Sequence, residues 1–254
     1  MTTLITPPRR RGIEYLDEPG LDPRLVRRSL ADVALANSLF GGTRAVLIEV
    51  ADVLPELGPT ATLLDVGSGI GDIAARTRQF ARTHDVDLSL VTIDMAETLA
   101  AASRARAGNN AVRGDATRLP FADRSVDLAM CSQTLHHFDD AGAAAVVREL
   151  DRVARVRVIV ADLRRSWVAA AGLWMASFPL GFHPVSRHDG VVSVMRGYTR
   201  QELGRLIASS IGRMPTVRRR IGWRVTATWT PGRPLGSDSA RTNRALERSD
   251  SLEG

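Results

Sequence analysis

Three closely spaced glycines follow an apolar run and an acidic residue in residues 63–72, Leu-Leu-Asp-Val-Gly-Ser-Gly-Ile-Gly-Asp. Gly67, Gly69 and Gly71 lack a Cβ atom, so the backbone can turn sharply there and a ligand can approach it closely. The helix expected next would present unpaired N–H groups and a partial positive charge at its start. The spacing differs from that of dinucleotide binders, and Asp65 suits a ligand ammonium better than a pyrophosphate. The stretch therefore indicates a nucleotide site at the carboxyl end of a first parallel strand.

Two further acidic residues follow apolar runs later in the chain. Asp94 ends the second predicted strand, where its carboxylate can accept hydrogen bonds from both ribose hydroxyls of a nucleoside. Met95 can then lie flat on an adenine ring. Asp115 can accept a hydrogen bond from the adenine N6 amine, while the N–H of Ala116 donates to the ring. The alternatives are a helix N-cap role for Asp94 and a turn role for Asp115.

Histidines supply the candidate proton acceptors, because imidazole changes its charge near neutral pH. His136 and His137 follow the fourth predicted strand, and either can act as a general base on a phenol or alcohol. The alternative is that one of them pairs with the backbone and starts the next helix. His188 and Asp189 form a second candidate pair, with a solvated loop as the alternative. Cys131 closes a buried strand, which favours a small apolar role over that of a nucleophile.

Alternating apolar runs and amphipathic stretches predict the elements that position these residues. Strands are predicted at 62–66, 88–93, 111–113, 126–131 and 156–161, and intervening helices at 72–83, 96–107 and 141–154. This alternation indicates a doubly wound α/β sheet, since continuous apolar strands are typical of a parallel sheet covered on both faces. A helix at 199–211, which begins with a capping box, leads to a predicted last hairpin of strands 216–221 and 224–230.

The chain before the first strand predicts a helical cap. Residues 1–60 are expected to hold a tail and two helices, at 23–38 and 43–57, with Asp22 and Thr43 as their N-caps. Residues 1–12 combine two prolines with three consecutive arginines, which predicts disorder.

The α/β domain itself is predicted over residues 61–235. Within it, residues 163–198 interrupt the alternation and predict an irregular lid inserted after strand five. Residues 236–254 are polar and are predicted to form a disordered tail.

Composition limits the function classes. The formal net charge is +6, all basic residues are arginine, and the excess lies in residues 161–254. A GC-rich genome accounts for this bias, and a basic face for a polyanion is the alternative. A single cysteine excludes an intrachain disulfide and favours the reducing cytoplasm. The longest apolar run, residues 167–180, is shorter than the roughly 20 residues of a membrane span, so a transmembrane segment is not expected.

The motifs and their order resemble those of class I S-adenosylmethionine-dependent methyltransferases, nearest the ubiquinone/menaquinone-biosynthesis-like and small-molecule branch. The resemblance covers about residues 60–230. It is carried by D-V-G-S-G-I-G, the acid that ends strand two, G-D-A-x-x-L-P-F, S-V-D-L, and Leu135-His136-His137-Phe138. It implies a Rossmann-like sheet of seven strands, with an antiparallel last hairpin and S-adenosylmethionine at the strand tips.

The resemblance also assigns cofactor-binding roles. It implies that Ser68, with Gly67 and Gly69, lines the methionine end, and that Asp65 anchors the amino group directly or through water. Ser132 and Gln133 would face the sulfonium. No metal is expected, because the Asp-Asn pair of metal-dependent catechol-type enzymes is replaced here by Asp162-Leu163-Arg164.

The expected reaction is methyl transfer to oxygen by in-line displacement, with a histidine as general base. A small aromatic, polyketide-like or quinone-like acceptor is expected, because residues 167–182 are rich in Trp, Phe and Met where a lid would lie. Methylation of RNA through the basic last third and a non-catalytic cofactor-binding role are the alternatives. The apolar segment also suits a homodimer face or a membrane-surface contact.

Overall fold

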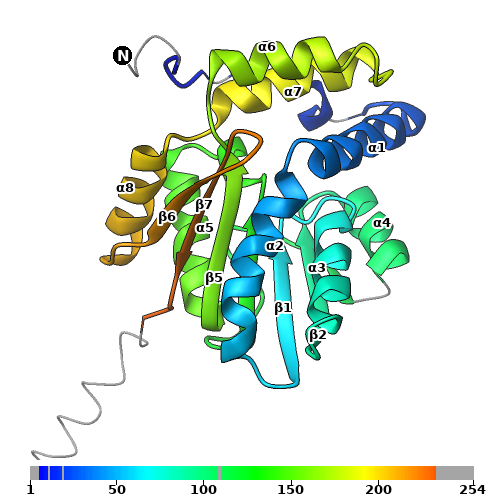
Figure 1. The fold of residues 1–254 in the computed structure, drawn as a ribbon. Helices are drawn as coiled ribbons and strands as arrows, with labels where there is room; N and C mark the ends of the chain where they lie inside the picture. Colours follow the sequence, from blue (N-terminus) through cyan, green and yellow to red (C-terminus); the bar gives the residue numbers. More distant parts are fainter. Residues whose placement is uncertain (1–5, 11, 19, 108–109, 233–254) are drawn as a thin grey trace, which may run out of the picture.

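The computed structural model describes residues 6–232 except 11, 19 and 108–109. Within these residues, seven strands form one sheet in the order β3-β2-β1-β4-β5-β7-β6 (Figure 1). The strands are β1 (Thr60–Val66), β2 (Asp87–Asp94), β3 (Asn110–Arg113), β4 (Val126–Ser132), β5 (Ala154–Leu163), β6 (Thr216–Arg220) and β7 (Arg224–Trp229). β1 to β5 are mutually parallel, whereas β7 is antiparallel to both β5 and β6. The predicted doubly wound sheet with an antiparallel last hairpin is confirmed.

Helices cover both faces of this sheet (Figure 1). One face carries α2 (Gly42–Val53), α3 (Asp72–Arg82) and α4 (Glu97–Ala107), and the other carries α5 (Asp140–Val153) and α8 (Arg200–Ile211). Val46 and Val50 of α2 pack with Leu63 of β1 in the first core layer. Val146 and Leu150 of α5 lie in the second layer. Burial on both faces explains why the central strands are continuous apolar runs.

A further group of helices lies over the carboxyl ends of the parallel strands (Figure 1). They are the short helix η1 (Tyr15–Asp17), α1 (Pro23–Leu39), the short helix η3 (Leu135–His137), α6 (Trp167–Ala176) and α7 (Pro184–Arg196). α6 packs on α7, and α7 in turn contacts α1, η1 and η3. This arrangement covers the edge of the sheet where the predicted site residues end their strands.

Residues 163–198 follow strand five as the predicted insertion, but the expectation that they are irregular is wrong, because most of this segment is helical. Ser166 caps α6 by accepting a hydrogen bond from the N–H of Val168. His183 caps α7 through its Nδ1, and Pro184 occupies the first helical position. The helical period of α6 is hidden in the sequence because apolar residues occupy nearly all of its sides.

The predicted disorder of residues 1–12 is wrong for the part that the structure describes. The Nε of Arg165 donates a hydrogen bond to the carbonyl of Pro7 at 2.7 Å, and the Nε of Arg9 donates to the carbonyl of Arg196 at 2.8 Å. These partners lie more than 150 residues away in sequence, so local composition does not reveal them. Residues 1–5 and 11 lie outside the described residues, as does the predicted tail at 236–254.

The turn between α1 and α2 differs from the prediction. Gly41, with a φ of 79°, is the N-cap of α2, so the predicted cap Thr43 lies inside the helix. α2 ends at Val53, and the short helix η2 (Leu54–Glu56) follows it. A Cβ on Gly41 would lie 2.6 Å from the carbonyl oxygen of Ile221, so this turn packs closely on the turn between β6 and β7. The contact joins two walls of the cavity described below.

The helices of the described ranges differ in length and in apolar content. No single helix there is both long enough and apolar enough to cross a membrane. Only α1 taken together with residues Gly42–Glu56 passes by length and composition, and the two are bent by 55° relative to each other.

Candidate active site

The glycine turn connects β1 to α3. Gly67, Gly69 and Gly71 all have positive φ angles, of 69°, 54° and 70°, which residues with a Cβ rarely adopt. A Cβ on Gly67 would lie 2.2 Å from the side chain of Thr134, and one on Gly71 would lie 2.5 Å from Ser103 Oγ. At Gly69 no described atom lies within 4 Å of such a Cβ. Packing therefore requires two of these glycines, while the third borders space that a ligand can enter.

A buried carboxylate lies directly before this turn. Asp65 is 2% exposed, and its Oδ1 has no hydrogen-bond partner among the described residues. Burial raises its pKa well above the usual value, and the charges of Asp72 and Asp94 raise it further. An unpaired buried carboxylate attracts a cation strongly. The ammonium group of an amino-acid ligand fits this position, and the Oγ of Ser68, also buried without a partner, offers a further polar contact.

Asp94 joins the end of β2 to the glycine turn. Its Oδ2 accepts a hydrogen bond from the N–H of Gly69 at 2.9 Å, and its Oδ1 accepts one from the N–H of Ala96 at 3.0 Å. Burial raises its pKa, although these backbone N–H groups act in the opposite direction. Each oxygen keeps a second lone pair that can accept from a ribose hydroxyl. The capping alternative is therefore present, and it is compatible with the predicted ribose contact.

Of the three residues predicted to contact adenine, Met95 and Ala116 line the cavity and Asp115 does not. The Oδ1 of Asp115 accepts hydrogen bonds from both the N–H and the Oγ1 of Thr117, each at 2.8 Å. Such contacts are those expected if Asp115 stabilises a turn, which was the alternative role. Asp115 is exposed and does not line the cavity. Ala116 and the exposed Met95 do line the cavity.

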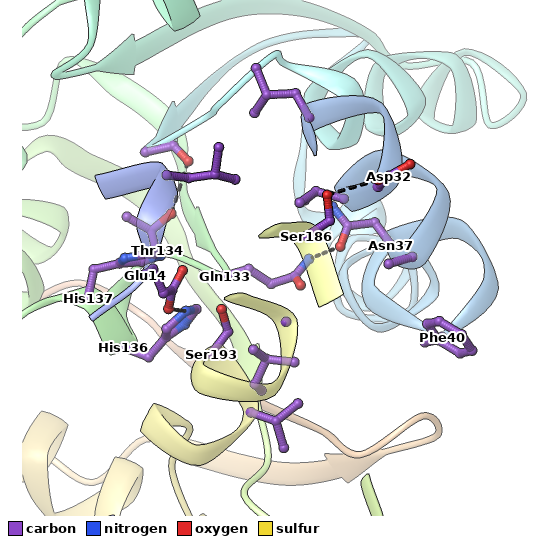
Figure 2. Close-up of a pocket in the computed structure, with 18 of the residues that line it drawn as sticks. Glu14, Asp32, Asn37, Phe40, Gln133, Thr134, His136, His137, Ser186 and Ser193 are labelled. Atoms are coloured by element: carbon purple, nitrogen blue, oxygen red, sulfur yellow. Dashed lines mark hydrogen bonds and ion pairs between the residues drawn. The ribbon is translucent and has the colours of Figure 1, made fainter. Parts of the chain in front are cut away.

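A cavity of about 1030 Å³ opens where α1, α6 and α7 cover the strand ends (Figure 2). The predicted site residues in its lining are Gly67, Asp94, Met95, Ala116, Gln133, His136 and His137. Apolar walls come from α1 and α6 and from the connection between α6 and α7, including Val26, Leu30, Val33, Val168, Leu173 and Phe182. The cavity thus joins the nucleotide turn to an apolar compartment large enough for a second ligand.

The tip of β4 supplies a strained residue to this cavity. Gln133 has a φ of 53°, and its Nε2 donates a hydrogen bond to Asn37 Oδ1 of α1 at 2.6 Å. Strained backbone of this kind is often held at functional sites by its surroundings. Ser132 is buried beside it, and its Oγ has no partner among the described residues.

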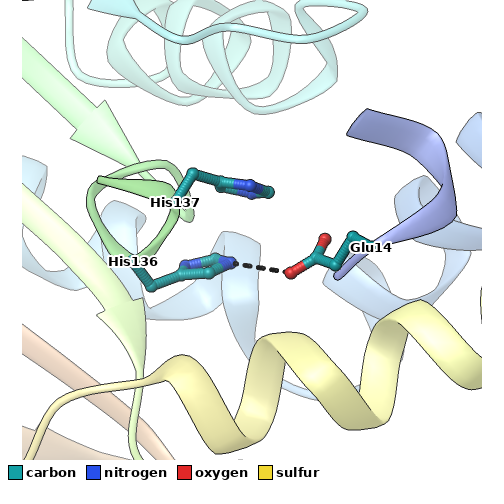
Figure 3. A group of neighbouring side chains, drawn as sticks. All are labelled: Glu14, His136 and His137. Atoms are coloured by element: carbon teal, nitrogen blue, oxygen red, sulfur yellow. Dashed lines mark ion pairs between the residues drawn. The ribbon is translucent and has the colours of Figure 1, made fainter. Parts of the chain in front are cut away.

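His136 forms a buried pair with Asp162 at the end of β5. The distance from His136 Nδ1 to Asp162 Oδ1 is 2.6 Å, and the N–H of His136 donates to Asp162 Oδ2 at 3.1 Å. Burial by itself raises the pKa of Asp162, but the charge and hydrogen bond of His136 and the N–H of Leu163 outweigh it, so the net direction is downward. The pair fixes the imidazole with Nδ1 toward the carboxylate and Nε2 toward Glu14, 4.0 Å from its Oε1 (Figure 3). No described group makes a hydrogen bond to this Nε2.

His137 stacks on His136 with a ring separation of 4.3 Å, and it is exposed. Its Nδ1 lies 3.3 Å from Arg196 Nη1, which also donates to Glu14 Oε1 at 2.9 Å. Ligand atoms of Glu14, His136 and His137 lie within 4.8 Å of one another, a spacing that a metal ion can use. The guanidinium of Arg196 bonds two of these three groups, so a metal ion there would face a positive charge at close range.

His188 lies away from the cavity lining. Its Nδ1 is 2.9 Å from Asp189 Oδ1, and its ring stacks on Tyr15 at 4.5 Å. Asp189 accepts hydrogen bonds from the N–H groups of Tyr15 and Leu16, each at 2.9 Å. The structure therefore brings this predicted pair to the N-terminal segment and not to the other histidines.

Several cavity residues were not singled out from the sequence. Glu14, Asn37 and Arg224 lie far from every motif, and only the fold brings them to the cavity. In the sequence, Asp162 marks only the place where metal-dependent catechol-type enzymes carry an Asp-Asn pair. Its position at the end of a strand next to β4 was the signal that could have paired it with His136.

Comparisons with known proteins support a common origin for the central part of the chain. Residues 64–161 match the family model described as Methyltransferase domain. An O-methyltransferase, rstn1 of Aspergillus nomiae, is 36% identical over 111 residues, which cover 40% of this chain and 46% of that protein. The match thus spans less than half the length of this curated relative.

Solved structures resemble the whole fold. A SAM dependent methyltransferase from Aquifex aeolicus has a TM-score of 0.53 at 16% identity, covering 82% of this chain and 98% of that one. Magnesium protoporphyrin IX methyltransferase from Synechocystis PCC 6803, solved with bound SAM, has a TM-score of 0.50 at 12% identity, with coverages of 85% and 87%. At these identities the likeness shows the fold alone. Residues 64–161 thus match a methyltransferase domain, and the fold around them resembles that of solved SAM-dependent methyltransferases.

Proposed function

We propose that this protein transfers a methyl group from S-adenosylmethionine to an oxygen atom of a small, largely apolar acceptor. The observation that carries the proposal is that one cavity joins the glycine turn to the His136–Asp162 pair. The O-methyltransferase name of the Aspergillus relative supports oxygen as the accepting atom.

The nucleotide half of the cavity fits S-adenosylmethionine, which supplies an electrophilic methyl group on a positively charged sulfur. Asp65 offers the ammonium of the methionine end a buried carboxylate whose Oδ1 has no hydrogen-bond partner among the described residues. Asp94 offers lone pairs to the ribose hydroxyls from the end of β2. The apolar walls of α1, α6 and α7 hold the acceptor and exclude water. Alignment of the acceptor with the methyl group supplies several kcal/mol of the barrier reduction.

His136 is the general base in this proposal. Nδ1–H donates to Asp162, which fixes the tautomer and leaves the lone pair of Nε2 for the proton of the acceptor hydroxyl. The imidazolium that forms then lies between the carboxylates of Asp162 and Glu14, which stabilise its charge. His137 is the weaker candidate, because its Nδ1 lies within hydrogen-bond distance of the Arg196 guanidinium.

RNA methylation has less support from the described residues. Several arginines of the basic last third are engaged in ion pairs within the chain, namely Arg165, Arg196, Arg213, Arg218 and Arg220. Paired guanidinium groups contribute less to a positive surface field than free ones. This observation favours a small acceptor over a polyanion.

The test uses S-adenosylmethionine labelled in its methyl group. The protein is incubated with it and with cell extract, and the products are separated into organic-soluble, nucleic-acid and protein fractions. The proposal expects label in the organic fraction, and none with Asp94→Ala in place of the native protein. Label in RNA would contradict the acceptor class. Absence of transfer to every fraction, with cofactor binding confirmed, would favour the non-catalytic alternative.

A further inference from the structure

Arg224, the first residue of β7, is a buried cation with no bonding partner among the described residues. It is 5% exposed and lines the cavity. Its Nε is fully buried, and none of its nitrogens makes a hydrogen bond or ion pair with any described residue. An isolated buried charge is strongly unfavourable when nothing compensates it. A ligand that supplies the missing acceptor oxygens would remove this cost.

A second buried arginine shows how the same chain satisfies a structural guanidinium. Arg165 is 3% exposed, and its Nε, Nη1 and Nη2 donate to Pro7 O, Gly197 O and Glu202 Oε1 at 2.7, 2.6 and 2.7 Å. Every nitrogen of that group has a partner within the fold. Arg224 is similarly buried, but no described residue bonds its guanidinium, so this group is available to a ligand that enters the cavity.

The register of the sheet fixes where Arg224 points. Arg224 is directly opposite Leu163 in the antiparallel pair of β5 and β7, so the two side chains share a face of the sheet. Both line the cavity. Asp162 is the neighbouring acid, but its oxygens accept hydrogen bonds from His136 and Leu163 and not from Arg224. Burial lowers the pKa of Arg224 to about 10, with the charge of Asp162 opposing the shift, so the guanidinium is charged at neutral pH.

We infer that Arg224 binds a carboxylate of the methyl acceptor, so that the substrate class is an apolar, ring-bearing hydroxy acid. A guanidinium matches a carboxylate with two parallel hydrogen bonds, and the surrounding apolar walls strengthen them. This inference rests on the proposed function, since it assigns a second contact to the same acceptor whose hydroxyl meets His136. The methionine end of the cofactor also carries a carboxylate, so the experiment separates these two sources.

The test measures binding by calorimetry in the presence of saturating S-adenosylhomocysteine. The probes are hydroxybenzoate, hydroxynaphthoate and hydroxyanthraquinone carboxylate, each compared with its primary amide. The native protein is expected to prefer the carboxylate of at least one pair by tenfold or more. Arg224→Met is expected to abolish that preference and to leave the affinity for S-adenosylhomocysteine within twofold. Arg164→Met is the matched control, because Arg164 also has an unpartnered buried Nε but lies outside the cavity lining.

The melting temperature of the ligand-free protein separates a binding role from a structural one. Arg224→Met removes an uncompensated buried charge, so an unchanged or raised melting temperature is expected. A lowered melting temperature would mean a structural role and would overturn the inference.

Three binding results would also overturn it. Equal binding of carboxylate and amide in all three pairs would exclude a carboxylate site. A tenfold loss of S-adenosylhomocysteine affinity in Arg224→Met would assign the residue to the cofactor instead. Failure of the native protein to bind S-adenosylhomocysteine would overturn the proposed function together with this inference.

Discussion

At the scale of single residues, the site is built from groups whose charges are incompletely compensated within the chain. Asp65 and Arg224 are both buried, and each has side-chain atoms without hydrogen-bond partners among the described residues. His136, in contrast, is fixed by Asp162 at Nδ1, while its buried Nε2 has no hydrogen-bond partner among the described residues. Such groups lower the stability of the ligand-free protein and increase its affinity for ligands of matching charge.

Replacement of His136 tests its assignment as the base. His136→Asn keeps a donor close to the position of Nδ1, so the buried carboxylate of Asp162 retains a partner. We expect kcat to fall by about 10² or more, because a positioned general base contributes that much, with S-adenosylhomocysteine affinity unchanged. His137→Asn is the matched control, and a fall of less than tenfold is expected for it. Equal losses for the two variants would contradict the assignment.

Asp65→Asn should stabilise the ligand-free protein and weaken cofactor binding. The pKa of Asp65 is raised in the fold, so its contribution to stability is present below the unfolded value of about 3.9 and is lost as pH rises through the folded pKa. The melting temperature of the variant should therefore exceed that of the native protein by an amount that grows from pH 4 toward neutral pH. Asp52→Asn, at an exposed position of α2, is the control. A native protein that is more stable than the variant at neutral pH would refute this account.

At the scale of elements, the segment with η1 closes the cavity beside the histidines. Asp189 of α7 holds η1 through two backbone N–H groups, and Arg196 of α7 donates to the carbonyl of Gly12 and to Glu14. These contacts place the carboxylate of Glu14 next to His136. α7 therefore orders a segment that carries part of the site.

Asp189→Ala should release this segment. Two partly buried backbone donors lose their acceptor, so amide hydrogen exchange over residues 12–18 should become faster, with little change in the strands of the sheet. The KM for the acceptor should rise, while the affinity for S-adenosylhomocysteine should stay the same. His188→Ala is the comparison variant, since it removes a half-exposed ring that contacts Tyr15 and Asp189 but leaves both backbone N–H bonds to Asp189 in place. Unchanged exchange in Asp189→Ala would show that other contacts hold η1.

At the scale of the whole molecule, both halves of the cavity depend on one sheet edge. The nucleotide half comes from β1, β2 and β4, whereas the acceptor half comes from β5, β7 and the covering helices. A ligand in the first half bridges β1 and β2 and should therefore stabilise the whole fold.

S-adenosylhomocysteine at 100 times its Kd should stabilise the protein by about 2.7 kcal/mol. For a chain of this size, this corresponds to a rise in melting temperature of roughly 5–11 °C. Asp94→Ala should abolish the rise, because Asp94 is assigned to the ribose. Asp87→Ala, at the other end of β2, should retain it. A full shift in Asp94→Ala, measured by scanning calorimetry, would remove the ribose assignment.

The sequence by itself determined the sheet and the nucleotide half of the cavity. Gly67, Asp94 and Gln133 each end or follow a predicted strand, and parallel strands end at one edge, so local motifs suffice to bring them together. The periodicity of α6 was hidden by its uniform hydropathy, so the sequence missed its helical form.

Only the tertiary structure supports the proposed acceptor half of the cavity, which no local motif predicts. The preference for His136 over His137 as the base depends on two long-range contacts. Asp162, 26 residues away in sequence, bonds His136, and Arg196, 59 residues away, contacts His137. Glu14 and Arg224 are far apart in sequence and both line the cavity, but neither belongs to a local sequence motif. Side-chain contacts between distant segments leave no periodic signal, because each depends on how the packed elements place two single residues.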